Sequence, residues 1–238
     1  MKYLKEYIRQ ILSENALGPQ ELAVIHKSHS NFAEAVIYDP AALLTILDDI
    51  LESSSGDDKI LGMLAQRLVD EDISKGFVEI GEPPKEDGRC NDAWEVSISA
   101  GPRYGSILYK VAFGLAQQNG KDLTSDRGGS SEKAQTRWGK EAAGRDKHPF
   151  DDITNPKTPP PEDDCKLQSN PTLNFSYGAG SGDMSTFEEL QNNHSKLLEE
   201  IDERFSVLSP KTVQTVKGYL GKVLLKSAGK LWNKHRPR

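Results

Sequence analysis

A strand-type run that leads through a glycine-containing bend directly into a helical pattern is the feature that most constrains this chain. Residues 94–99 alternate polar side chains with large apolar ones, as a strand with two different faces does. They continue into Gly101-Pro102-Arg103-Tyr104-Gly105, and a helical pattern follows from about Ser106 to Gln118. A strand, a bend and a helix in this order predict a sheet with helices packed on it.

Similar patterns extend on both sides of this segment. Before it we predict strands at 22–26, 35–38 and 77–80, and helices that begin at Pro40 and near Ile60. After it we predict a strand at 123–126, a helix at 130–143 and a sheet-edge strand at 173–177. The fold class is therefore α+β, with a mixed, mostly antiparallel sheet flanked by helices. We expect a core at 20–180, an amphipathic helix at 185–206 that a capping box starts near Ser185 or Thr186, and a basic helix at 207–238.

Composition excludes several classes of protein. No apolar run approaches the roughly 18 residues that cross a bilayer, and charged residues interrupt the N-terminus where a signal peptide is apolar. We therefore expect no transmembrane segment and a cytoplasmic location. Cys90 and Cys165 are too few for a thiolate metal site, and His26 and His29 lack a nearby carboxylate pair, so we predict no metal.

The C-terminal end is electrostatically distinct from the rest. Residues 207–238 carry eight Lys or Arg and no acid, whereas the whole chain has a net charge of −6, so the remainder carries −14. An amphipathic helix of this charge suits an acidic protein surface, including this protein's own, as well as nucleic acid or an anionic membrane. All three partners remain open from the sequence.

Residues 93–144 resemble the acyl-CoA-binding core of GNAT acyltransferases. The loop of that family reads Arg or Gln, two residues, Gly, one residue, then Gly or Ala; here Gly105 fits the last position, while Arg103 and Ala100 depart from the other two. Downstream, the family's Asn-x-x-Ala-x-x-apolar-Tyr pattern is similar to Ser131, Ala134, Arg137 and Trp138, with Trp138 in the place of the tyrosine.

The resemblance implies transfer of an acyl group from acetyl-CoA or another acyl-CoA to an amine of a protein or small molecule. The backbone amides of Arg103, Tyr104, Gly105 and Ser106 would then hold the pyrophosphate, with Ser131 nearby. Ile98 and Ser99 would pair with the pantetheine arm. Glu95 is the candidate general base, because alternation places Glu95, Ser97 and Ser99 on one face; the competing interpretation is a solvated edge-strand glutamate. The alternative functions are a GNAT-like virion or host-takeover binding protein without catalysis, and a nucleic-acid-binding protein that binds through the basic tail at 207–238.

Residues 1–14 read as an amphipathic helix and are similar to the capsid-targeting peptides of internal head proteins of tailed phages. Those peptides are cleaved after Leu or Ile, any residue, then Glu, and here Leu12-Ser13-Glu14 stands at that place. The resemblance implies a phage product that is packaged in a virion with capsid components and acts on a host target. An ordinary helix that packs on the domain is the alternative.

Overall fold

The computed structural model describes residues 16–53, 57–70, 73–83, 92–101, 103–125, 132–150 and 174–235. A short 3₁₀ turn, η1 (Pro19–Glu21), precedes the first strand. The described helices are α2 (Pro40–Ser53), α3 (Asp57–Asp70), α4 (Gly105–Gln118), α5 (Glu132–Ala142), α6 (Ser181–Arg204) and α7 (Pro210–His235). The strands are β1 (Ala23–Ser28), β2 (Phe32–Tyr38), β3 (Ser74–Gly81), β4 (Trp94–Ala100), β5 (Leu123–Ser125), β6 (Lys147–Pro149) and β7 (Phe175–Tyr177).

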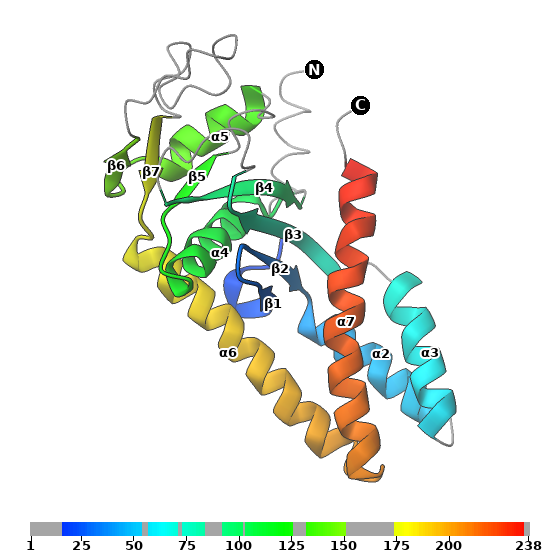
Figure 1. Cartoon of the computed structure of the whole chain (residues 1–238). Coiled ribbons are helices and arrows are strands. Elements are labelled where there is room, and N and C mark those ends of the chain that lie inside the picture. The colour runs from blue at the N-terminus through cyan, green and yellow to red at the C-terminus, as the bar shows by residue number, and fades with distance from the viewer. Residues whose placement is uncertain are drawn as a thin grey trace.

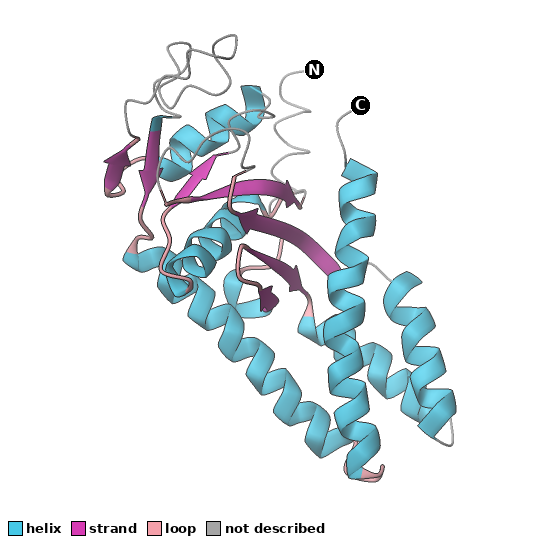
Figure 2. Ribbon diagram, in the orientation of Figure 1, coloured by secondary structure: helices cyan, strands magenta, loops and turns pink. Residues whose placement is uncertain are grey.

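The strands form one sheet in the order β1-β2-β3-β4-β5-β7-β6. All neighbours are antiparallel except β4 and β5, which run parallel. Figure 2 shows this sheet in the upper part of the molecule with helices around it, and the two long helices α6 and α7 meet below it (Figure 1). The predicted α+β class, with a mixed and mostly antiparallel sheet, is confirmed.

One face of the sheet is covered by α4, α5 and the first half of α6. Trp138 of α5 is 1% exposed and stacks on Phe113 of α4, with Tyr177 of β7 against its edge. Gly114 lets α4 and α6 approach closely, because a Cβ there would stand 2.7 Å from the Phe187 side chain. This α4 face is therefore a closed aromatic core.

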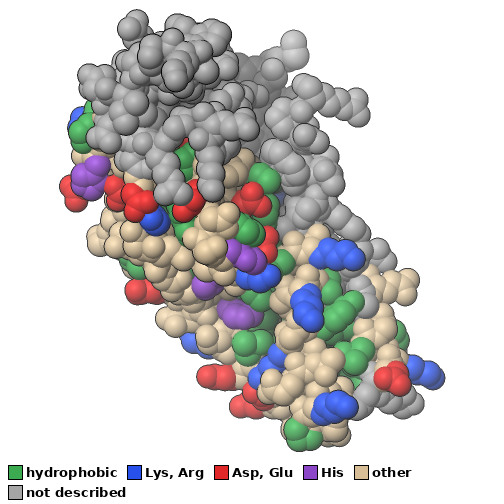
Figure 3. All heavy atoms as spheres, viewed as in Figure 1, with side chains coloured by type: hydrophobic (Ala, Val, Ile, Leu, Met, Phe, Trp, Pro, Cys, Tyr) green, Lys and Arg blue, Asp and Glu red, His purple; other side chains and the backbone are tan. Residues whose placement is uncertain are grey.

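The opposite face is covered by α7. Gly221 lies against Ile25 of β1, and Leu225, one turn later, packs on the cluster of Val36 and Phe77 from the next two strands. The apolar stripe of α7 thus docks on this protein itself, while Lys211, Lys222 and Lys226 remain exposed. On the face drawn in Figure 3, Lys and Arg side chains are scattered over the area that α7 occupies in Figure 1. Binding to nucleic acid or membrane by these cations stays a prediction.

Local signals explain most of the element boundaries. Asp39 caps α2 by accepting a hydrogen bond from the Ala42 amide at 3.0 Å, as the Asp-Pro pair predicts. The sequence pattern predicts a start of α6 near Thr186, but α6 begins at Ser181, because the Asp183 carboxylate accepts the Gly180 amide at 2.7 Å. Arg145 also pairs with Asp183 through both of its terminal nitrogens, which fixes the end of α5 to the start of α6.

Two further strands differ from the predicted layout. Residues 175–177 form β7, which lies inside the sheet between β5 and β6 rather than at its edge. The edge is β6, a three-residue polar strand whose side chains are all exposed, so it lacks the apolar alternation that marks a strand in a sequence. The predicted N-terminal helix at 1–14 lies outside the described residues, as do residues 151–173.

Candidate functional site

Strand β4 is paired on both sides over its first half only. Its parallel partner β5 matches Trp94 with Leu123, Glu95 with Thr124 and Val96 with Ser125, and β5 ends there. On the other side, β3 continues alongside β4 as far as Ala100. Among the described residues, β4 therefore has no strand beside residues 97–100 on the β5 side. This open edge offers backbone hydrogen-bonding groups to an extended ligand.

A β-bulge marks the point where the two parallel strands part. Glu79 of β3 stands opposite Ile98 and Ile80 stands opposite Val96, so Ser97 has no counterpart on β3. The extra residue reverses the alternation: Trp94 and Val96 belong to the core under α4, whereas Ile98 packs against Val36 and Phe77 on the α7 face. The prediction that Trp94, Val96 and Ile98 share one face is therefore wrong beyond the bulge.

The bend between β4 and α4 has an unusual backbone conformation. Arg103 has φ = 78°, the only positive φ of a non-glycine residue in the described part of the chain. Residues with a Cβ rarely occupy this left-handed region, which is where the family pattern has a glycine. Arg103 is exposed, so its guanidinium lies at the surface of the bend. The backbone at this position thus takes the conformation that glycine favours despite the arginine.

The first amides of α4 differ in whether the described residues supply an acceptor. The Tyr104 N–H donates to the Gly101 carbonyl at 3.1 Å, so this predicted ligand amide already has an acceptor within the chain. In contrast, the amides of Gly105, Ser106 and Ile107 have no acceptor among the residues that the structure describes, and no side chain caps the helix. These donors and the positive end of the helix dipole favour an anion.

A carboxylate from α5 lies beside these amides. The Ser106 hydroxyl donates to Glu141 Oε1 at 3.1 Å, and Arg137 Nη2 pairs with the same oxygen at 2.6 Å. The Arg137 Nε is buried and has no hydrogen-bond partner among the described residues. Arg137 and Glu141 of α5 thus lie beside the start of α4, and the charge of Arg137 is balanced by that of Glu141.

Other predicted site residues are distributed as follows. Ser99 is exposed on the open half of β4, and Ser131 lies outside the described residues. Trp138, which stands in the place of the family's tyrosine, is buried in the aromatic core, and no described residue accepts a hydrogen bond from its indole nitrogen. An indole buried in this way supplies no proton to a leaving thiolate, so this position is structural.

The α7 face of the sheet carries carboxylates that the sequence analysis missed. Glu34 of β2 and Glu79 of β3 stand directly opposite each other, and both are half-buried. Burial, and in second place the negative charge of Glu34, raise the pKa of the Glu79 carboxyl. Glu95, half-buried, lies on the same face opposite Gly81. Only the strand register brings Glu34 and Glu79 together; their sequence positions give no signal.

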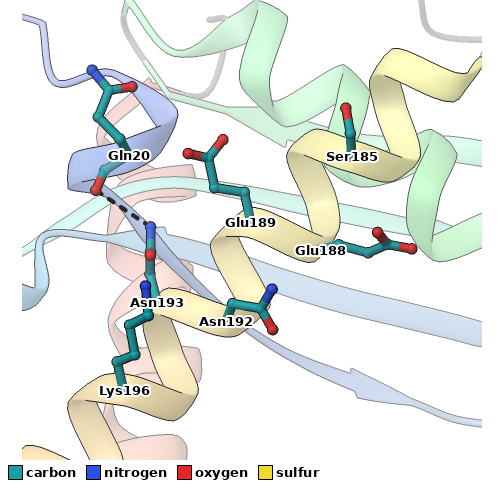
Figure 4. A pocket seen from close by; sticks show the side chains of 7 residues that line it. All are labelled: Gln20, Ser185, Glu188, Glu189, Asn192, Asn193 and Lys196. Atoms are coloured by element: carbon teal, nitrogen blue, oxygen red, sulfur yellow. Dashed lines mark hydrogen bonds between the residues drawn. The ribbon is translucent and has the colours of Figure 1, made fainter.

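A surface pocket of about 380 Å³ lies elsewhere, between α6 and η1. Its lining is polar, and the side-chain amide of Asn193 donates a hydrogen bond to the backbone carbonyl of Gln20 at 3.4 Å. The labelled side chains diverge instead of converging on one point, with Glu188 directed away from Gln20 and Lys196 (Figure 4). None of the predicted site residues lines this pocket, and its open polar form does not suit acyl-CoA.

Two further kinds of feature are absent from the described residues. They contain no group of three or more His, Cys, Asp or Glu side chains that could hold a metal ion. None of their helices is sufficiently long and apolar to span a membrane.

The comparisons with known proteins give no relative. No protein-family model, no curated protein and no solved structure matches this chain. A function must therefore be argued from the open half of β4, the bend and the start of α4.

Proposed function

We propose that this protein is an acyl-CoA-dependent N-acyltransferase of the GNAT type. The observation that carries the proposal is the opening between β4 and β5. The two parallel strands pair over three residues, and β4 then continues past a bulge and leads through the bend to a helix start whose amides at Gly105, Ser106 and Ile107 find no acceptor in the described part of the chain. An extended edge followed by an anion site matches an extended molecule with a phosphorylated end, which is the form of acyl-CoA.

Each part of the substrate has a stated place in this proposal. The pantetheine arm pairs with the free edge of β4 at Ile98 and Ser99. The pyrophosphate lies on the amides of Gly105, Ser106 and Ile107, with the Arg103 guanidinium as its exposed counter-ion. The acceptor amine attacks the thioester carbonyl, coenzyme A leaves as a thiol, and a carboxylate takes the proton of the ammonium. Glu95 is the carboxylate that the sequence predicts for this step.

Isothermal titration with acetyl-CoA tests the binding step, and Gly105 offers a matched pair of variants. A Cβ at Gly105 meets nothing within 4 Å, so both Gly105→Asp and Gly105→Ala keep the fold. An aspartate in the first turn favours the helix but repels a pyrophosphate, whereas alanine changes neither charge nor amide. We expect binding by the wild type and Gly105→Ala and no heat with Gly105→Asp. Equal heats for all three, or none with the wild type at high micromolar acetyl-CoA, contradict the proposal.

A catalytically silent acyl-CoA-binding protein is the second candidate. The burial of Trp138 favours it, because the family's tyrosine position supplies no acid here. Release of coenzyme A from acetyl-CoA in the presence of amines separates the two, because the silent protein binds acetyl-CoA without turnover. The phage origin, the virion location and the capsid partners are proposals that rest on residues 1–14, and mass spectrometry of the particle-borne protein for cleavage after Glu14 tests them.

A further inference from the structure

We infer that the outward side of α7 is an interaction surface for the phosphate backbone of double-stranded nucleic acid. We call this surface the α7 cationic stripe and define it by Lys211, Lys222 and Lys226, which are exposed. It lies apart from the residues assigned to acyl-CoA, so it adds a second binding function to the one proposed above. The inference rests on how α7 is docked, on what its outward side contains and on which of its charges are paired.

The apolar side of α7 is already occupied. Val216, Leu220 and Leu224 are at most 2% exposed and belong to the core that α7 shares with α2, α3 and α6. Leu225 packs on the sheet. A helix that binds a bilayer places its apolar side in the lipid interface, and here that side faces the protein. This arrangement disfavours the membrane among the three partners that the sequence leaves open.

The outward side of α7 has the composition of a phosphate-binding surface. Between Lys211 and Lys226 its exposed residues, other than lysines, are Gln214, Thr215 and Gly218, so none of them is apolar. Protein–protein interfaces are enriched in aromatic residues and depleted in lysine, whereas a lysine contact to a phosphate needs no apolar anchor. These features favour nucleic acid over an acidic protein as the partner.

The protein does not neutralise the charges of the α7 cationic stripe. Lys217 pairs with Asp202 of α6 at 2.5 Å and is half-buried. In contrast, the three lysines of the stripe have no ion-pair partner among the described residues. Residues 207–238 also contain no acid that could compete for them. The positive charge on this side is therefore available to an external polyanion.

The lysines follow the helix as a row. Lys222 and Lys226 are four residues apart, which is about 6 Å along the axis. The sequence repeats this step with lysines at 230 and 234, and the helix backbone extends to His235. On the face drawn in Figure 3, Lys and Arg side chains follow the course that α7 takes in Figure 1. Each strand of a duplex carries a phosphate every ~3.4 Å of its axis, so such a row can lie along a run of phosphates.

The same surface predicts the form of the nucleic acid and the kind of contact. Proteins that bind single strands stack the bases on aromatic side chains. The exposed residues between Lys211 and Lys226 include no aromatic, and Tyr219 is half-buried against the helical core. Surface lysines contact phosphates, which carry no sequence information. Binding should therefore be to the duplex, independent of sequence and steeply dependent on salt.

The test uses the full chain and a short labelled DNA duplex of arbitrary sequence, with fluorescence anisotropy measured from about 50 to about 200 mM NaCl. Three phosphate contacts predict that log affinity falls against log salt with a slope of about −2.7, because each contact contributes about −0.9. The double variant Lys222→Gln with Lys226→Gln should make this slope shallower by about 2. It should also weaken binding at the lowest salt by about tenfold or more.

A second pair of exposed lysines supplies the matched control. Lys140→Gln with Lys196→Gln removes the same charge from α5 and α6 and should leave the slope close to that of the wild type. All four lysines are exposed, so both double variants should melt at the wild-type temperature, and thermal unfolding checks this. Both should also bind acetyl-CoA as the wild type does, which keeps this test separate from that of the proposed function.

Several results overturn the inference. They are the absence of duplex binding at the lowest salt, an equal change of slope in the control pair, and tighter binding of single-stranded DNA of the same length. Binding to vesicles that contain phosphatidylserine, without binding to the duplex, would assign the α7 cationic stripe to a membrane instead. Displacement of the duplex by poly-glutamate at equal charge concentration would assign it to an acidic protein.

Discussion

The two halves of β4 differ in almost every physical respect. Trp94 to Val96 have strands on both sides, and Trp94 and Val96 are buried under α4. Beyond the bulge, Ser97 and Ser99 are exposed, and the strand has a neighbour only on the β3 side in the described structure. One strand thus stabilises the fold with its first half and leaves a backbone edge for a ligand with its second.

The largest predicted contrast is in stability. Trp94→Ala removes a side chain that is 2% exposed and should lower the free energy of unfolding by about 3–5 kcal/mol. Ser99→Ala removes only an exposed hydroxyl and should change it by less than about 0.5 kcal/mol. Urea denaturation followed by tryptophan fluorescence and circular dichroism measures both. Similar losses in the two variants would erase the distinction between the halves.

The next effect concerns the end of the open half, where Glu141 lies beside Ser106. Glu141→Gln keeps the shape of the side chain but removes a negative charge and releases Arg137. We expect acetyl-CoA to bind about tenfold more tightly, equivalent to about 1.4 kcal/mol. Titration calorimetry at two salt concentrations checks this, with Glu199→Gln on the exposed side of α6 as a control of equal charge change. Unchanged affinity would show that no anion approaches Glu141.

A smaller effect is expected at the bend that follows the open half. Arg103→Gly relieves a left-handed backbone conformation that costs a residue with a Cβ about 1–2 kcal/mol, although glycine returns part of this through its more flexible unfolded state. The variant should therefore be more stable by about 0.5–1 kcal/mol. It should bind acetyl-CoA more weakly, because the exposed guanidinium is lost. Denaturation and titration of one sample measure stability and affinity. If Arg103→Gly is less stable than the wild type, the backbone at Arg103 is not strained.

The smallest effect lies away from β4, in the contact of α6 with the first two strands. Burial lowers the pKa of His26 and, together with the charge of His26, that of His194, which hydrogen-bonds Tyr38 Oη at 2.6 Å. Both histidines favour the neutral form in the folded state, so their stabilisation is complete above about pH 6.5 and is lost as pH falls through the lowered values. Melting temperatures between pH 7.5 and 5 should fall, and less so in His26→Gln. An equal fall in melting temperature in the wild type and in His26→Gln would show that His26 does not contribute to the pH dependence of stability.

The sequence predicts the first, stabilising half of β4 better than its second half, which is the proposed binding edge. Helical spacing identifies α4, and alternating residues identify the first half of β4, because buried faces leave a periodic pattern. The bulge at Ser97 leaves no periodic pattern, because a serine stands both at the bulge and two residues later. Simple alternation therefore assigns Ile98 to the wrong face of the sheet. The pairing of Glu34 with Glu79 depends on register, and register is decided by contacts between distant parts of the chain.

Hydrogen exchange of backbone amides with and without acetyl-CoA tests the difference between the halves of β4 most directly. Bound acetyl-CoA should slow exchange at residues 97–107 and leave the amides of residues 94–96 and of β2 unchanged, because these segments already have a strand on each side. Unchanged exchange at 97–107 under saturating acetyl-CoA, or protection confined to another part of the molecule, would contradict the assignment of this edge and helix start as the acyl-CoA site.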